Sequence, residues 1–237
     1  MPRKPLIVLV LLLTVGPADQ GPDKAGHYTA VLSAQQPSSD DRAAMLRGID
    51  AKRERYAGVA KEIWGFAEIG YQEQKSSALL QQQLKAAGFQ VTAGVAGIPT
   101  AFVATFGSGK PVIGIVGEFD ALPGLSQEAQ TANHHAIEEG APGHGCGHNL
   151  LGTGALAAAV AVKEWLVASG HTGTLRYYGT PAEEGGSGKV YMVRDGLFKD
   201  VDVAVSWHPG DRNEASPTSS TANITGKFRF HGVAAHA

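Results

Sequence analysis

Short strand-like runs alternate with helix-like segments along most of this 237-residue chain, and this alternation constrains the fold more than any other feature. The expected strands cover residues 89–93, 100–106, 112–117, 174–179 and 202–207, and the expected helices cover 40–64, 74–87, 149–168 and 188–194. Strands interleaved with helices favour an α/β fold, in which helices cover both faces of one sheet. Gly88 and Gly170 each follow an expected helix, where glycine tolerates the left-handed conformation that ends it.

The first residues have the pattern of an export signal. Arg3 and Lys4 precede a ten-residue apolar run at 6–15, which is too short for a bilayer that requires about 20 residues. This pattern predicts a signal peptide over residues 1–19, a polar linker over 20–39 and a periplasmic or secreted protein. The alternative is an uncleaved anchor or a mis-assigned start, and without a true signal peptide the protein is expected to be cytoplasmic.

The charge balance argues against one class of partner. The chain has 20 basic and 22 acidic residues, a net charge of −2 and a pI near 6.5. Such a chain has no broad positive field, so we expect no nucleic-acid partner. Its single cysteine, Cys146, excludes an internal disulfide and leaves a thiol that is available for other chemistry.

Polar side chains follow three of the expected strands and precede the expected helix at 149–168. They are Asp120 after 112–117, Glu183 and Glu184 after 174–179, His208 after 202–207, and Cys146 with His148 before 149–168. In open α/β sheets, ligands bind beyond the carboxyl ends of the strands. We therefore expect these side chains to meet in one site.

The residue types in these segments suit a metal site. Cys146 and His148 lie two apart in a glycine-rich loop, and sulfur with imidazole suits zinc and other borderline metals. Glu183 and Glu184 are adjacent, and neighbouring side chains of an extended backbone point in opposite directions. One carboxylate is then expected to bind metal while the other acts on a metal-activated water as a general base. Asp120 is placed to orient a metal ligand.

Each of these residues also has a structural alternative. Cys146 alone is equally consistent with a buried structural cysteine, His208 with a core histidine and Asp120 with a turn cap. Glu183 and Glu184 alone are more typical of a solvated acidic turn. What favours a site is that all these segments occur together at equivalent strand ends.

A long loop, residues 124–147, separates the third expected strand from the long helix. Loops of this length within a compact domain are usually functional or mobile. The loop carries His134, His135 and His144, which we expect to line a surface rather than to bind metal.

Four motifs in order resemble the co-catalytic metallopeptidase family of aminoacylases, carboxypeptidases and amidohydrolases. They are Gly-Glu-Phe-Asp-Ala-Leu-Pro at 117–123, His-Gly-Cys-Gly-His-Asn at 144–149, Pro-Ala-Glu-Glu-Gly at 181–185 and Trp-His-Pro at 207–209. The Cys-Gly-His version is similar to the branch that hydrolyses N-acyl and N-aroyl amino acids, aminobenzoyl-glutamate among them. The resemblance covers the chain from about residue 40 to its end.

The resemblance implies a mixed sheet flanked by helices, with an inserted α+β lid domain that dimerises. It further implies a site for two divalent ions, zinc or manganese. The implied roles are metal ligands for Cys146, His148, Glu184 and His208, general base for Glu183, and a lid histidine that contacts substrate for His236. We expect Asp120 to be a catalytic residue together with Glu183. The implied partners are a small N-acyl amino acid substrate and, through the lid, a second copy or another subunit.

On this basis we expect a catalytic domain over 40–221 and the start of the lid at 222–237. The sequence ends before the family's last ligand histidine, so we expect a fragment with weak or partial metal occupancy. The leading functional hypothesis is an amidohydrolase of N-acyl amino acids. The alternatives are a dipeptidase or carboxypeptidase of the same family and a metal-binding fragment without activity.

Overall fold

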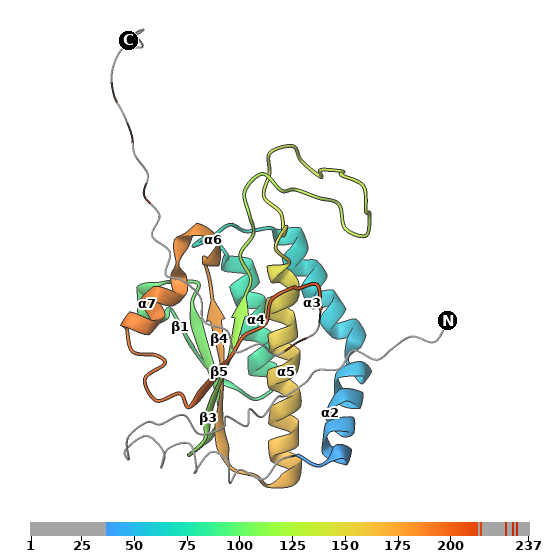
Figure 1. The fold of residues 1–237 in the computed structure, drawn as a ribbon, viewed down its shortest axis with the longest axis vertical. Coiled ribbons are helices and arrows are strands. Elements are labelled where there is room, and N and C mark those ends of the chain that lie inside the picture. Colours follow the sequence, from blue (N-terminus) through green and yellow to red (C-terminus); the bar gives the residue numbers. More distant parts are fainter. Residues whose placement is uncertain (1–36, 213, 215–225, 227–228, 230, 232–237) are drawn as a thin grey trace. The chain divides into compact units, whose positions relative to one another are not determined.

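A five-stranded mixed sheet forms the centre of the computed structural model, which describes residues 37–212 together with 214, 226, 229 and 231 (Figure 1). Its strands are β1 (Gln90–Ala93), β2 (Phe102–Ser108), β3 (Val112–Glu118), β4 (Gly173–Thr180) and β5 (Val203–Val205), in the order β1-β2-β4-β3-β5. β3 is parallel to both of its neighbours, β4 and β5, whereas β2 is antiparallel to β1 and β4. The carboxyl ends of β3, β4 and β5 therefore share one edge of the sheet.

Helices cover both faces of this sheet. The helices are α2 (Ser39–Ala51), α3 (Arg53–Phe66), α4 (Gln74–Ala86), α5 (His148–Ser169), α6 (Glu183–Gly186) and α7 (Gly188–Arg194), with a short 3-10 turn η1 (Val95–Gly97). α3, α4 and α5 contribute to the larger core on one face, while α7 lies on the other side of the strands (Figure 1). The predicted mixed sheet flanked by helices is confirmed.

Neighbouring tyrosines in β4 show how strand alternation builds the two cores. The Tyr177 side chain points toward α5, where its hydroxyl donates to the carbonyl of Gly152, while Tyr178 packs with Met192 of α7. Both tyrosines are fully buried. Burial of a large apolar side chain contributes about 1.5–3 kcal/mol, so β4 stabilises both layers.

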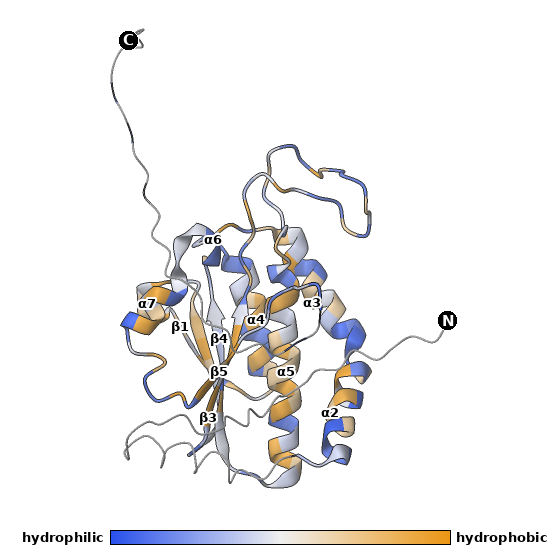
Figure 2. Ribbon diagram, in the orientation of Figure 1, coloured by the Kyte–Doolittle hydropathy of each residue, from blue (hydrophilic) through white to orange (hydrophobic). Residues whose placement is uncertain are grey.

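α5 is the central helix of the larger core. By length and composition it is apolar enough to cross a membrane, but half of its most apolar stretch is buried inside the fold. It packs on β3 and β4 through small residues such as Ala155 and Ala159, and Figure 2 shows it as largely apolar along its middle. α5 is therefore a core helix of this domain.

The expected helix at 40–64 is wrong in one respect, because it is two helices. The helical conformation is interrupted at Lys52 (φ −106°, ψ 13°), which ends α2 and precedes α3. The N-terminal cap is Ser38, whose hydroxyl accepts the amide of Asp41, while the Asp41 carboxylate accepts the amide of Ser38. Asp41 therefore completes a capping box from inside the helix.

The other expected elements lie within a few residues of the observed ones, and the 124–147 loop is irregular as expected. Much of this loop projects beyond the body of the fold at the end where α6 lies and is largely hydrophilic (Figures 1 and 2). The expected signal peptide at 1–19 lies outside the described residues, as do nearly all of the linker at 20–39 and of the lid segment at 222–237. The division of the chain into these parts stays a prediction, as does export.

Candidate metal centre

The carboxyl ends of the three parallel strands bring the predicted polar segments together. In the β3–β4 ladder, Glu118 at the end of β3 is level with Thr180 at the end of β4. The chain then continues from β4 into the turn that carries Glu183 and Glu184, and from β5 toward His208. Parallel pairing thus explains why segments far apart in sequence form one cluster.

Cys146, His148 and His208 form one set of donor atoms. Their sulfur and ring nitrogens all lie within 4.8 Å of one another, and the Cys146 Sγ is 3.3 Å from the His208 Nε2. The rings of His148 and His208 meet edge to face with centroids 6.2 Å apart. A thiolate and two imidazoles at this spacing are a donor set for a borderline divalent ion.

His148 also belongs to a second set, with Glu183 and Glu184. One carboxylate oxygen of each glutamate lies 3.9 Å from the His148 Nε2. The expectation that the two carboxylates point in opposite directions is wrong, because they lie on a tight turn rather than in an extended strand. Glu183 is the more exposed, at 38% of its side chain against 22% for Glu184.

Asp120 fixes the orientation of the His148 ring. The His148 Nδ1 lies 3.0 Å from one carboxylate oxygen of Asp120, and the other oxygen accepts the backbone amide of Glu184 at 2.9 Å. Both Asp120 and His148 are buried. The contact leaves only the Nε2 of His148 to face the cluster, which is how a carboxylate commonly orients a metal-binding histidine.

Unpartnered buried atoms supply the test of whether a metal fits these residues. In the part of the chain that the structure describes, the Nε2 of His148 and one oxygen of Glu118 are buried without a hydrogen-bond partner, although they lie 3.3 Å apart. Buried polar atoms without partners are costly, and a cation between such atoms removes that cost. The other Glu118 oxygen pairs with Lys189 of α7. The donor chemistry and the unpartnered atoms therefore fit a divalent ion.

The electrostatics of the cluster favour added positive charge. Burial raises the pKa of the Cys146 thiol to about 11, and the charges of Glu184, Glu183 and Glu118 act in the same direction. Burial opposes protonation of His148, but its hydrogen bond to Asp120 and the surrounding carboxylates raise its pKa overall. In the absence of an ion the cluster thus retains protons, and a bound cation would displace them.

Glycine is needed where the cysteine loop packs most tightly. A Cβ on Gly143 would overlap the carbonyl oxygen of Leu125, so only glycine fits there. Gly147 has a φ of +78° at the start of α5, which turns the chain so that His148 begins that helix. These two positions place Cys146 and His148 beside the ends of β3 and β4.

The sequence matches a known family of proteins. Residues 114–231 match the sequence profile of peptidase family M20/M25/M40. The chain belongs to this family.

Curated relatives of this M20 chain include two hydrolases. A p-aminobenzoyl-glutamate hydrolase chain of Escherichia coli K12 is 53% identical over 80% of this chain and 39% of its own length. The Xaa-Arg dipeptidase of Mus musculus is 30% identical over 80% of this chain and 42% of its own. The chain thus spans about two fifths of the length of these relatives.

A solved M20 structure shares the fold. A dinuclear metal-binding peptidase from Bacillus subtilis superimposes with a TM-score of 0.56 at 20% identity, over 65% of this chain and 42% of that one. This likeness confirms that the mixed sheet and its helices are those of an M20 domain.

The structure therefore brings together all the predicted site residues that it describes. His236 lies outside the described residues, and its role stays a prediction. The expectation that His144 lines a surface is wrong: it is buried, its Nε2 lies 3.0 Å from the carbonyl of Ile63, and burial lowers its pKa to about 4. His134 and His135 are exposed as expected.

Sequence reasoning missed two charged residues that contact the segments of the cluster. Glu73 accepts the backbone amide of Ala182, and Lys189 pairs with Glu118. Each is a single charged residue near a helix end, a pattern typical of solvated surface. Nothing in the sequence distinguishes a buried carboxylate such as Glu73 from that common case, so only the packing reveals it.

Proposed function

We propose that the intact protein is a metal-dependent amidohydrolase that cleaves the amide bond of N-acyl or N-aroyl amino acids, p-aminobenzoyl-glutamate among them. The observation that carries this proposal is the convergence of two donor sets on the unpartnered Nε2 of His148. The 53% identity to a hydrolase chain named for p-aminobenzoyl-glutamate supports the choice of substrate.

We propose that two divalent ions, zinc or manganese, are held by Cys146, His148, Glu184 and His208. When bound, they would polarise the amide carbonyl and make water more acidic. Asp120 holds the His148 ring through its Nδ1, so the ring keeps one orientation while the substrate binds.

Glu183 is proposed as the general base because it is the more exposed of the two adjacent carboxylates. Its carboxylate takes a proton from the attacking water and passes it to the nitrogen of the leaving amine. His236 is proposed to contact the substrate carbonyl and stabilise its negative charge, as the family resemblance implies.

The substitution Glu183→Gln in the intact protein tests this assignment. It keeps the side-chain shape but removes the base, so kcat is expected to fall about 10²–10⁴-fold while bound metal stays unchanged. The matched control is Glu128→Gln, an exposed acid in the 124–147 loop that should leave kcat unaltered. Wild-type turnover by Glu183→Gln with metal bound would remove Glu183 from this role.

A dipeptidase of the same chemistry is the second candidate, because a 30% identical relative is an Xaa-Arg dipeptidase. The metal cluster does not distinguish the two, since selectivity depends on the walls of the substrate pocket. Values of kcat/KM for aroyl amino acids and for dipeptides with C-terminal arginine decide between them. A preference of tenfold or more for the dipeptides would replace the leading proposal.

The proposed substrate is a small molecule in either case. Assembly with a second copy or with a different chain remains a proposal that depends on the segment from residue 222 onward. Analytical ultracentrifugation of the intact protein, with and without that segment, measures whether the segment is required for assembly.

A further inference from the structure

The turn that carries the two glutamates has an unfavourable backbone. We call residues 181–187 the carboxylate turn. Ala182 and Ser187 have φ values of +54° and +56°, in the left-handed region that non-glycine residues rarely adopt. Such a conformation persists only when the surrounding structure holds it in place.

A buried carboxylate holds the first residue of this turn. The backbone amide of Ala182 donates to the Glu73 Oε1 at 2.7 Å, and the hydroxyl of Thr100 donates to the Glu73 Oε2 at 3.1 Å. Glu73 is completely buried and Thr100 is 3% exposed. A buried carboxylate is costly, so its retention at the end of a strained turn calls for a reason beyond packing.

The segment before Glu73 contacts the turn at two further points. The Tyr71 hydroxyl donates to the carbonyl of Gly186 at 2.5 Å, near the other end of the turn. A Cβ on Gly70 would lie 3.0 Å from the Cα and Cβ of Ala182, so the two backbones are in close contact. Residues 70–73, which we call the clamp segment, therefore hold the turn on both sides of Glu183 and Glu184.

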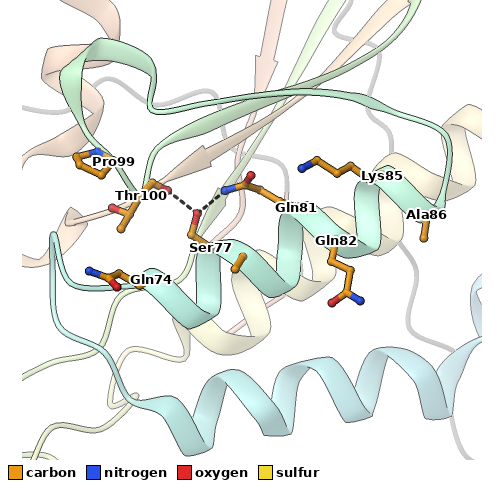
Figure 3. Close-up of a pocket in the computed structure, with 9 residues that line it drawn as sticks. Gln74, Ser77, Gln81, Gln82, Lys85, Ala86, Pro99 and Thr100 are labelled. Carbon is orange, nitrogen blue, oxygen red and sulfur yellow. Dashed lines mark hydrogen bonds between the residues drawn. The ribbon is translucent and has the colours of Figure 1, made fainter.

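The support for Glu73 extends to the surface of α4. Thr100 lines a pocket together with α4, and the Ser77 hydroxyl donates to the Thr100 carbonyl at 2.8 Å (Figure 3). Gln81 in turn donates to the Ser77 hydroxyl. The Glu73 carboxylate is thus fixed from α4 and from the loop before β2, not only by its own backbone.

We propose that Glu73 is a positioning residue that aims the Glu183–Glu184 pair at the metal cluster by holding the amide of Ala182. This inference rests on the proposed function, because it gives that function a requirement outside the cluster. Loss of the carboxylate lets Ala182 relax from its left-handed conformation, and the two following side chains shift with it. A displacement of about 1 Å in a catalytic group can cost about 10²-fold in rate.

The test compares Glu73→Ala with Glu73→Gln. The glutamine still presents an oxygen to the Ala182 amide, so it should keep metal affinity and kcat within about threefold of wild type. The alanine removes the acceptor and should weaken Zn²⁺ or Co²⁺ binding by about 10–100-fold, measured by competition with a chromophoric chelator. In the intact protein it should also lower kcat by about 10²-fold with little change in KM.

A matched control separates positioning from loss of stability. Thr174→Val removes a buried hydroxyl at the opposite end of β4, where it donates to the carbonyl of Gly109 at 2.7 Å. This variant should melt at a lower temperature and yet bind metal as wild type does. If Glu73→Ala fails to fold, Tyr71→Phe serves instead, because it frees the carbonyl of Gly186 and should weaken metal binding about threefold or more.

Two sets of outcomes distinguish the positioning role of Glu73 from the proposed hydrolase activity. Wild-type metal affinity in both Glu73→Ala and Tyr71→Phe, or in the only one that folds, overturns the positioning role whatever the turnover. Weakened metal binding in these variants, with no amide cleavage by the intact wild-type protein, supports the positioning role and refutes the proposed hydrolase.

Discussion

The two ends of the sheet handle their acidic residues differently. Near the start of β3 and β5, each acid has its own base: Arg176 makes two 2.6 Å contacts to Asp200, and Lys110 lies 2.9 Å from Asp202. At the other end, where β3 and β4 finish, four carboxylates surround His148, and among the described residues Lys189 is the only lysine or arginine paired with any of them.

This contrast shows what each end is built to do. At the first end each carboxylate is neutralised by a basic side chain, so no ion from solution is required to balance its charge. Crowded carboxylates repel one another. Burial lowers the pKa of His148, but its hydrogen bond to Asp120 and the nearby carboxylates raise it overall, so the second end favours additional positive charge. The candidate metal centre thus lies at the end of the sheet where carboxylates outnumber basic side chains.

The largest expected effect is that of metal on stability. An ion present at 100 times its Kd stabilises the folded state by about 2.7 kcal/mol, which raises the Tm of a domain this size by about 5–10 °C. Differential scanning fluorimetry with Zn²⁺, then with excess chelator, measures this shift.

The control for the metal experiment is Lys110→Met, which alters the paired end alone and should show the same shift as wild type. His148→Ala should show almost none. A full shift in His148→Ala would place the ion outside the proposed cluster.

A smaller effect is expected from the pH dependence of Glu73. Burial raises its pKa above the usual 4.5, despite the opposing hydrogen bonds, so the folded chain retains a proton that the unfolded chain has lost. The free energy of unfolding therefore falls as pH rises above 4.5 through the raised pKa. Glu73→Gln removes the ionisable group, so the metal-free variant should gain stability relative to wild type as pH rises. An unchanged difference between pH 4 and 8 in urea titrations would contradict this.

The smallest effect should come from the paired end, with the opposite sign. The hydrogen bond from Arg176 lowers the pKa of Asp200 below 3.8, so the pair contributes stability above that pH and loses it in acid. Asp200→Asn should lower the Tm slightly at pH 7, and the difference from wild type should shrink as the pH falls below 3.8 and vanish once the pH is below the lowered pKa of Asp200. Because both partners are partly exposed, added salt should shrink the effect. A difference that grows in acid would mean that the pKa of Asp200 is not lowered in the folded state.

The parts of the site that follow from chain direction were predictable from sequence. Cys146, His208 and the glutamate pair each flank an element whose type is clear from its residues, and parallel strands bring such positions together. The parts that depend on packing were not. The glutamates were expected to alternate as in a strand, but the left-handed Ala182 turns both of them toward His148.

Burial was the second source of error. His144 belongs to a loop of polar residues, so sequence favours exposure, yet its ring fills space beside Trp64 and Ile63. Ser38 precedes the expected start of its helix, and its capping role depends on a reciprocal bond with Asp41 that only three-dimensional geometry shows.

The single thiol of the chain gives this centre a built-in reporter. Cys146 is partly exposed, and the sequence contains no other sulfhydryl that could compete for a labelling reagent. In this 237-residue chain, alkylation therefore measures the fraction of candidate centres that hold no ion. Its rate at rising pH tracks thiolate formation, and protection by an added ion reads out occupancy at one known atom.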